Sequence, residues 1–121
     1  MSQVDLLSKV RTKAYNCAHF AGDVWEHETG EDIRPILTGF LAVRRERRIT
    51  SSLHRDFIRI ENPVSPCIVL FRHPEAKVDP HVGVYLRGKV LHLDGKAPIR
   101  QEVQVIAEQN QYTSVRYYAP R

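Results

Sequence analysis

A cysteine stands at the predicted start of a helix, a position that favours nucleophilic chemistry. Asn16 precedes Cys17, and asparagine is a good N-cap because its side-chain oxygen can accept a hydrogen bond from the first turn. A thiol at this end of a helix lies near the positive end of the helix dipole, which favours the thiolate. The more common role of a single cysteine is that of a buried structural residue. The position of Cys17 by itself leaves both roles open.

The residues that follow Cys17 have the pattern of an amphipathic helix. Four apolar residues recur at helical spacing and mark one face: Phe20, Ala21, Val24 and Trp25. Gly30 follows Thr29, and glycine is the usual residue just past a helix end. The pattern predicts a helix over residues 17–28, with the thiol on its first residue.

A cysteine nucleophile needs a neighbouring base, and the base needs a third group that orients it. Two predicted strands, residues 81–86 and 89–94, are separated by an Arg-Gly turn and form a hairpin. In that hairpin His81 lies near the start of the first strand and His92 near the end of the second, almost opposite each other. Two imidazoles on one sheet, facing the helix that begins at Cys17, would supply the base, His81, and its orienter, His92.

The remaining histidines are predicted to be surface residues or satisfied core residues. They are His19, His27, His54 and His73. His19 and His27 belong to one helix but are eight positions apart, which does not suit the i, i+4 pair of a metal site. Cys17 and Cys67 show no CxxC spacing. We therefore expect neither a metal nor another cofactor.

The order of the predicted elements indicates an α+β fold in one domain, residues 1–121. The chain has 121 residues, of which 42% are hydrophobic and 26% charged, as in an ordinary globular domain. Predicted helices cover residues 4–14 and 17–28 and a segment that begins at Glu31. Predicted strands cover residues 67–72, 81–86, 89–94 and 113–118, and a short helix is predicted over residues 100–109. Residues 49–61 are ambiguous between helix and strand. We expect N-terminal helices packed on an antiparallel sheet.

The net charge is +4, and much of the excess lies in Arg44–Arg48. No aromatic side chain interleaves with these arginines, so the cluster does not indicate a single-strand binding platform, and we expect no nucleic-acid partner. An anionic polymer or a solvated surface explains the cluster equally well. The chain has no apolar stretch long enough for membrane insertion and no signal-peptide core, so we expect it to be made in the cytoplasm.

Three blocks of the sequence resemble the NlpC-type cysteine peptidases, which are papain-like cell-wall hydrolases. Residues 16–20, Asn-Cys-Ala-His-Phe, resemble the Asp-Cys-Ser-Gly-(apolar) nucleophile block of that family. Residues 66–71, Pro-Cys-Ile-Val-Leu-Phe, resemble its Pro-Gly-Asp-Leu-(apolar)-Phe strand. Residues 81–92 begin with His-Val-Gly-Val-Tyr-Leu and end with Val-Leu-His, and they resemble its His-Val-Gly-Ile-Tyr-Leu … Ile-His hairpin. The order of the blocks is also that of the family.

The resemblance implies a papain-like NlpC-type fold and a hydrolase that cleaves γ-D-glutamyl or related amide bonds in peptidoglycan stem peptides. Cys17 would attack the carbonyl, His81 would take its proton, and His92 would orient His81. The backbone N–H of Cys17 would be one oxyanion donor. Residues 15–33 further resemble members encoded near phage tail genes. The implied partners are the stem-peptide substrate and other phage tail proteins, and the implied location is a phage tail that acts at the periplasmic cell wall.

The chain departs from the family pattern before the cysteine. The family has a Tyr-x-(aromatic)-Gly-Gly block there, whereas residues 6–9 read Leu-Leu-Ser-Lys, so the resemblance assigns no residue to the role of that tyrosine. Two alternative functions stay open. One is a tail-assembly structural module with little or no turnover, and the other is a thiol acyltransferase or deamidase that acts on a protein substrate.

Overall fold

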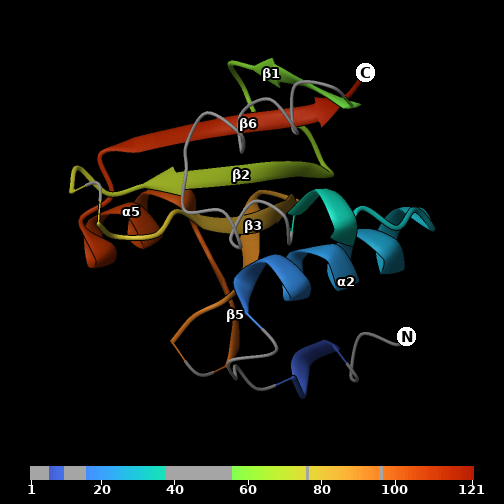
Figure 1. Cartoon of the computed structure of the whole chain (residues 1–121), viewed down its shortest axis with the longest axis horizontal. Coiled ribbons are helices and arrows are strands. Elements are labelled where there is room, and N and C mark those ends of the chain that lie inside the picture. Colours follow the sequence, from blue (N-terminus) through green and yellow to red (C-terminus); the bar gives the residue numbers. More distant parts are fainter. Residues whose placement is uncertain (1–5, 10–15, 38–55, 76, 96) are drawn as a thin grey trace.

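A computed structural model describes residues 6–9, 16–37, 56–75, 77–95 and 97–121 (Figure 1). The elements in these residues are α2 (Cys17–Thr29), β1 (Phe57–Ile60), β2 (Cys67–Arg72), β3 (His81–Leu86), β4 (Lys89–Leu93), β5 (Pro98–Gln101), α5 (Val103–Asn110) and β6 (Ser114–Pro120). Most of the predicted helix over residues 4–14 lies outside the described residues, as do His54 and the Arg44–Arg48 cluster. Of the helix expected after Glu31, residues 34–37 are helical, and the remainder lies outside the described residues. No helix in the described part is long and apolar enough to cross a membrane.

The six strands form one sheet in the order β1-β6-β2-β3-β4-β5, and each neighbouring pair is antiparallel. The predicted α+β class is therefore confirmed, with an N-terminal helix packed on an antiparallel sheet. The ambiguous segment ends in a strand, β1, and three other predicted strands match β2, β3 and β4 closely. The last strand begins one residue later than predicted and continues to Pro120.

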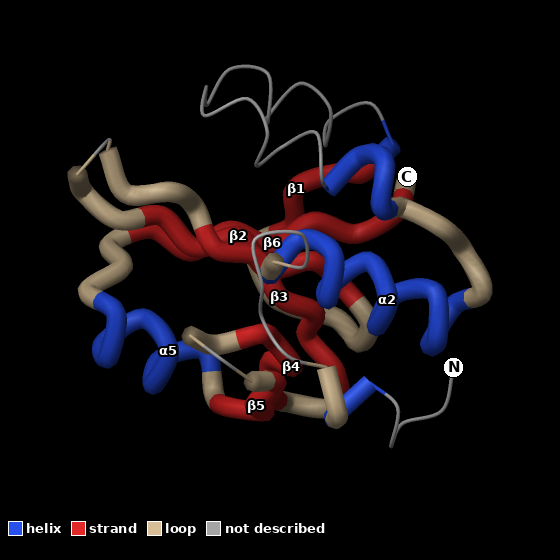
Figure 2. The backbone as a smooth tube through the Cα atoms, turned by 60° about the horizontal axis from the view of Figure 1, so that its bottom comes forward, coloured by secondary structure: helices blue, strands red, loops and turns tan. Residues whose placement is uncertain are grey.

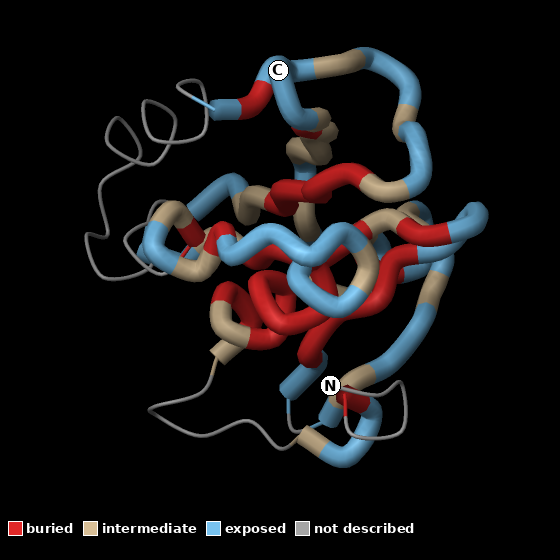
Figure 3. Tube along the Cα trace, turned by 90° about the vertical axis from the view of Figure 1, so that its right-hand side faces the viewer, coloured by how far each residue is buried: buried red, intermediate tan, exposed pale blue. Residues whose placement is uncertain are grey.

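The sheet is covered on both faces, by α2 on one side and α5 on the other (Figure 2). The apolar stripe of α2 is fully buried, as predicted, against residues of the sheet that include Ile68, Val82 and Leu91. Ile106 of α5 packs with Val69 and its neighbours on the other face. Because side chains alternate along a strand and both faces of the sheet are covered, β2 needs apolar residues on both faces, and its residues 67–71 are all buried. The buried segments gather in the interior of the molecule (Figure 3).

The β3–β4 hairpin closes with the predicted turn at Arg87 and Gly88. Both residues have positive φ, 49° and 90°, as a two-residue hairpin loop of the I′ type requires. Glycine adopts this conformation without steric cost. The hairpin places His81 and His92 toward its open end, away from the turn.

The predicted helix over residues 100–109 is partly wrong. Residues 98–101 form β5, an edge strand that pairs with β4, and α5 begins only at Val103. The exposed backbone edge of β4 offers hydrogen bonds to this segment, and such tertiary pairing outweighs a weak local preference. The consequence is that Gln101 lies beside β4 instead of on a helix.

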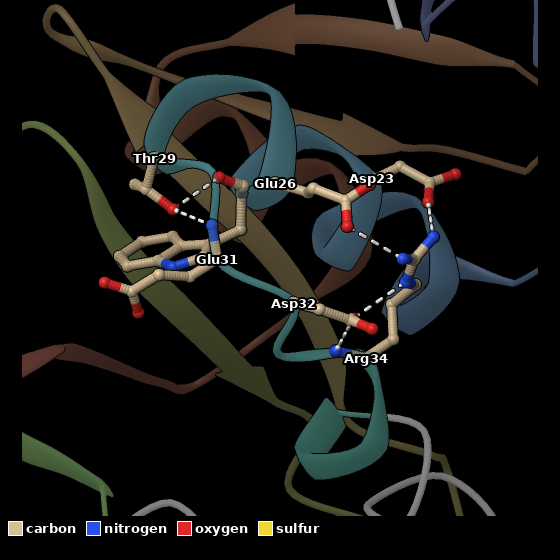
Figure 4. Close-up of polar contacts among 7 residues, drawn as sticks. Asp23, Glu26, Thr29, Glu31, Asp32 and Arg34 are labelled. Atoms are coloured by element: carbon tan, nitrogen blue, oxygen red, sulfur yellow. Dashed lines mark hydrogen bonds and ion pairs between the residues drawn. The ribbon is translucent and has the colours of Figure 1, made fainter.

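Arg34 ties the segment after α2 back onto that helix (Figure 4). Its guanidinium contacts carboxylate oxygens of Asp23 at 3.0 Å, Glu26 at 2.9 Å and Asp32 at 2.9 Å. Asp23 is buried, and a buried carboxylate needs such a partner. Gly22 leaves room for the arginine, because a Cβ at this position would lie 2.3 Å from the Arg34 Cγ.

We predict that Gly22→Ala destabilises the protein although alanine favours helices. The better helix propensity is worth about 1 kcal/mol, whereas overpacking costs about 1–3 kcal/mol, and the displaced Arg34 would weaken its contact with buried Asp23. We expect the free energy of unfolding in urea to fall by about 1 kcal/mol or more. Gly95→Ala is the control, since a Cβ there meets nothing within 4 Å. A more stable Gly22→Ala protein would contradict this account of Arg34.

Candidate active site

Cys17 is the first residue of α2, and Asn16 caps the helix as predicted. The Asn16 Oδ1 atom accepts hydrogen bonds from the backbone N–H groups of Ala18 at 3.0 Å and His19 at 3.3 Å. The His19 Nδ1 atom in turn accepts the backbone N–H of Asn16 at 3.3 Å, which completes a capping box. This reciprocal cap fixes where the helix begins, and so it fixes the thiol at the positive end of the helix dipole.

Cys17 is buried in the core. The residue is 2% exposed and belongs to the buried cluster between α2 and the sheet. The same cluster includes Val82 and Leu93, which directly follow His81 and His92 in the chain. Helix α2 packs against β3 and β4, the two strands that carry these histidines. The thiol is therefore held over the histidine-bearing strands, inside the core rather than at the surface.

The two histidines of the hairpin are in direct contact. The His81 Nε2 and His92 Nδ1 atoms are 2.8 Å apart, and the rings meet nearly edge to face, at an angle of 81°. Both residues are buried, with 7% and 1% of their surface exposed. The sequence-based expectation that these imidazoles come together is met.

The contact is diagonal, which corrects the expectation that the histidines lie almost opposite each other. The register pairs Val84 with Leu91, and its continuation places Gly83, not His81, beside His92. A Cβ on Gly83 would lie 3.0 Å from the His92 Cβ and 2.6 Å from the Val90 Cγ1. Gly83 therefore leaves the space that the His92 side chain uses to reach along the sheet to His81.

The ring of His81 is enclosed by aromatic side chains. Its ring lies parallel to that of Tyr112, with 6.0 Å between centroids and an interplanar angle of 5°. Phe71, its register partner on β2, lies at 5.9 Å. Phe71 and Tyr112 pack in the cluster under α5, so the two imidazoles lie on that side of the sheet, while Cys17 lies on the α2 side. This placement corrects the expectation that both imidazoles face the helix of Cys17: side chains alternate along β3 and β4, and Val82 and Leu93, not the histidines, point toward α2. His81 is the first residue of β3 and so lies at one end of this interior strand.

His92 has a second polar partner that the sequence did not indicate. Its Nε2 atom is 3.0 Å from the Gln101 Oε1 atom, and the Gln101 Nε2 atom donates to the Gln109 Oε1 atom at 3.1 Å. Gln101 was hidden because its segment was assigned to a helix. No local sequence signal marks this position, because it depends on the pairing of residues 98–101 with β4.

Burial keeps His92 neutral. Loss of hydration lowers the pKa of His92 below its usual value, and the Gln101 hydrogen bond and the Asp94 charge only partly offset this effect. A neutral imidazole has one donor and one acceptor nitrogen. His92 can therefore accept at one ring nitrogen and donate at the other, as an orienting residue must.

Among the described residues, Cys67 and the other three histidines do not join this site. Cys67 is fully buried at the start of β2, and burial raises the pKa of its thiol. His19 serves the helix cap, His27 is exposed near the end of α2, and the His73 Nδ1 atom accepts the backbone N–H of Glu75. Among the described residues, no group of three or more His, Cys, Asp or Glu side chains could hold a metal ion.

Comparisons with protein-family models, with curated proteins and with solved structures found no match to this chain.

We predict a pH dependence of stability that originates at His92. Because its pKa is lowered in the folded state, the unfolded chain binds a proton at this residue at a higher pH than the folded chain does. Stability is therefore complete above about pH 6.5 and falls as the pH drops below it, by at most about 1.4 kcal/mol per pH unit. Urea unfolding at about pH 7.5 and about pH 5.5 should show a smaller loss for His92→Gln than for wild type. Equal losses would contradict a neutral, buried His92.

Proposed function

We propose that this chain is a cysteine hydrolase of the NlpC type, with a papain-like fold, that cleaves amide bonds of peptidoglycan stem peptides. The observation that carries the proposal is the 2.8 Å contact between His81 and His92, on the two strands against which the helix of Cys17 packs. Cell-wall hydrolysis from a phage tail is the biological setting that the sequence resemblance favours.

Each residue has a role in this chemistry. The Cys17 thiol gives its proton to His81, and the thiolate forms a bond to the carbonyl carbon of the substrate amide. The backbone N–H of Cys17 donates to the oxyanion. Protonated His81 then gives its proton to the leaving amine as the C–N bond breaks. Water, deprotonated by His81, cleaves the thioester and releases the acid, and His92 holds the His81 ring throughout.

Two features at the start of α2 support a reactive thiol. The Asn16 cap fixes Cys17 as the first residue of the helix, and the helix dipole favours a negative charge there. His81 is the first residue of β3, and we expect the Cys17 sulfur to reach the His81 ring around this end of the strand. Thiolate formation by transfer of a proton to an imidazole is how papain-like enzymes activate cysteine.

A second candidate function is a structural tail-assembly module with the same fold. The 2% exposure of Cys17 favours it, because desolvation by itself raises the pKa of a thiol and burial keeps substrates away. The two candidates make opposite predictions about the reactivity of Cys17.

We predict that iodoacetamide alkylates Cys17 well below the free-cysteine pKa of about 8.5 and far faster than Cys67. Cys67 is an internal control, since its buried thiol has a raised pKa. Peptide mass spectrometry after timed labelling measures both rates. His81→Ala should slow the labelling of Cys17 and leave that of Cys67 unchanged. Slow and equal labelling of the two thiols would support the structural module instead.

We predict that the protein releases stem-peptide fragments from purified peptidoglycan, as read by mass spectrometry. Cys17→Ser and His81→Ala should lower the rate by at least about 10²- to 10⁴-fold, since they remove the nucleophile and the base. His92→Ala should leave more activity, because an orienter is lost rather than a base.

Cys67→Ala is the matched control and should retain activity, with circular dichroism to verify the fold of each variant. Release that is unaffected by Cys17→Ser would refute the proposal. Equal losses in His81→Ala and His92→Ala would refute the division of roles between the two histidines.

A further inference from the structure

The side chains around His92 form one continuous line of hydrogen bonds from β3 to α5. The line runs from His81 Nε2 to His92 Nδ1, at 2.8 Å, and from His92 Nε2 to Gln101 Oε1, at 3.0 Å. It ends where Gln101 Nε2 donates to Gln109 Oε1, at 3.1 Å. Four elements thus contribute one residue each: β3, β4, β5 and α5.

We propose that Gln101 is a positioning residue that fixes the tautomer of His92 and thereby makes Nδ1 of His81 the catalytic base. The inference rests on the proposed function, and it adds a residue and a specific nitrogen atom to it. Gln101 acts only through His92 and does not touch the reacting atoms.

The amide of Gln101 has a donor end and an acceptor end, and in this structure the acceptor end faces His92 while the donor end faces Gln109. The NH₂ group donates to the Gln109 Oε1 atom, so the carbonyl oxygen faces the His92 Nε2 atom. A carbonyl oxygen only accepts hydrogen bonds. With the amide in this orientation, His92 carries its proton on Nε2.

The tautomer of His92 determines the tautomer of His81. A neutral His92 with its proton on Nε2 has its lone pair on Nδ1, and Nδ1 is the atom that contacts His81. His81 must then donate from its Nε2 atom. In neutral His81 the lone pair is consequently on Nδ1, and that nitrogen is the one able to take a proton from a thiol.

The amide of Gln101 is uncharged, and this lets His92 stay in its neutral form. A carboxylate at this position would stabilise the imidazolium form of His92, as the nearby Asp94 already does in part. An imidazolium donates from both nitrogens, so His92 would donate to the His81 Nε2 atom and reverse its tautomer. His81 would then carry its proton on Nδ1 and could not act as a base there. An amide accepts the hydrogen bond of His92 without this effect.

The test is to read the histidine tautomers directly by long-range ¹H–¹⁵N spectra of the imidazoles at neutral pH. In wild type we expect the Nε2–H tautomer for both His81 and His92. Gln101→Met, which keeps length without an acceptor, should give mixed tautomers at His92. Gln101→Glu should give a charged His92 and an Nδ1–H tautomer at His81.

Hydrolysis rates supply the second readout. Gln101→Met should lower kcat by about 10- to 100-fold, as loss of an outer hydrogen-bond partner does in other sites, with KM unchanged. Gln101→Glu should lower it further at neutral pH and recover as the pH rises above the pKa of His92, which a merely structural defect would not do. The control is Gln104→Met, because the Gln104 side chain makes a hydrogen bond of similar length, 3.0 Å, to Glu108 within α5.

The two proposals fail in different ways. An Nδ1–H tautomer at His92 in wild type, or tautomers that Gln101→Met leaves unchanged, would overturn the role of Gln101 even in an active enzyme. The expected tautomers in a protein that releases no stem peptides would support that role as the determinant of the tautomers and count against hydrolysis alone.

Discussion

The contact between two buried imidazoles is the constraint to which much of the surrounding structure responds. A buried polar group without a hydrogen-bond partner costs roughly 1–3 kcal/mol, and His81 and His92 together bring four ring nitrogens into or next to the core. Their mutual contact satisfies one nitrogen of each ring. The Gln101 Oε1 atom satisfies the Nε2 atom of His92, and this contact requires Gln101 to lie on a strand beside β4. The formation of β5, and the start of α5 only after it, therefore depend on the same constraint.

The same constraint explains two features around the histidines, one on β3 and one in the residues that follow α5. Gly83 lacks the side chain that would otherwise press on His92 and Val90. Tyr112 closes over His81 with its ring parallel to the imidazole. The space at Gly83 lets His92 reach His81, and Tyr112 limits how far the His81 ring can move. A restrained ring is what a base needs for efficient proton transfer. On the other side of the sheet, the Asn16 cap restrains the thiol in a comparable way.

The elements that carry the candidate site could be predicted because their signals are local. The cap and apolar stripe of α2, the Arg-Gly turn and the alternation of β3 each lie within a short window of sequence. From these the proximity of His81 and His92 follows. Gln101 could not be predicted, because its position depends on pairing with β4 and not on the residues around it. The Tyr112 ring likewise reaches His81 only through the packing of α5 on the sheet, and the packing of Arg34 onto Gly22 depends on how the chain folds back.

The proposed function depends on proton transfer from the Cys17 thiol to His81. The ionisation of that thiol tests it most directly. The ultraviolet absorbance of thiolate, followed from acid to alkaline pH in wild type and in Cys17→Ser, isolates the titration of Cys17 from that of Cys67. The account predicts a pKa of Cys17 below the value of about 8.5 for a free cysteine, and a rise of that pKa in His81→Gln. A pKa above 8.5 that does not respond to His81→Gln would show a thiol that is only buried, and it would contradict the account.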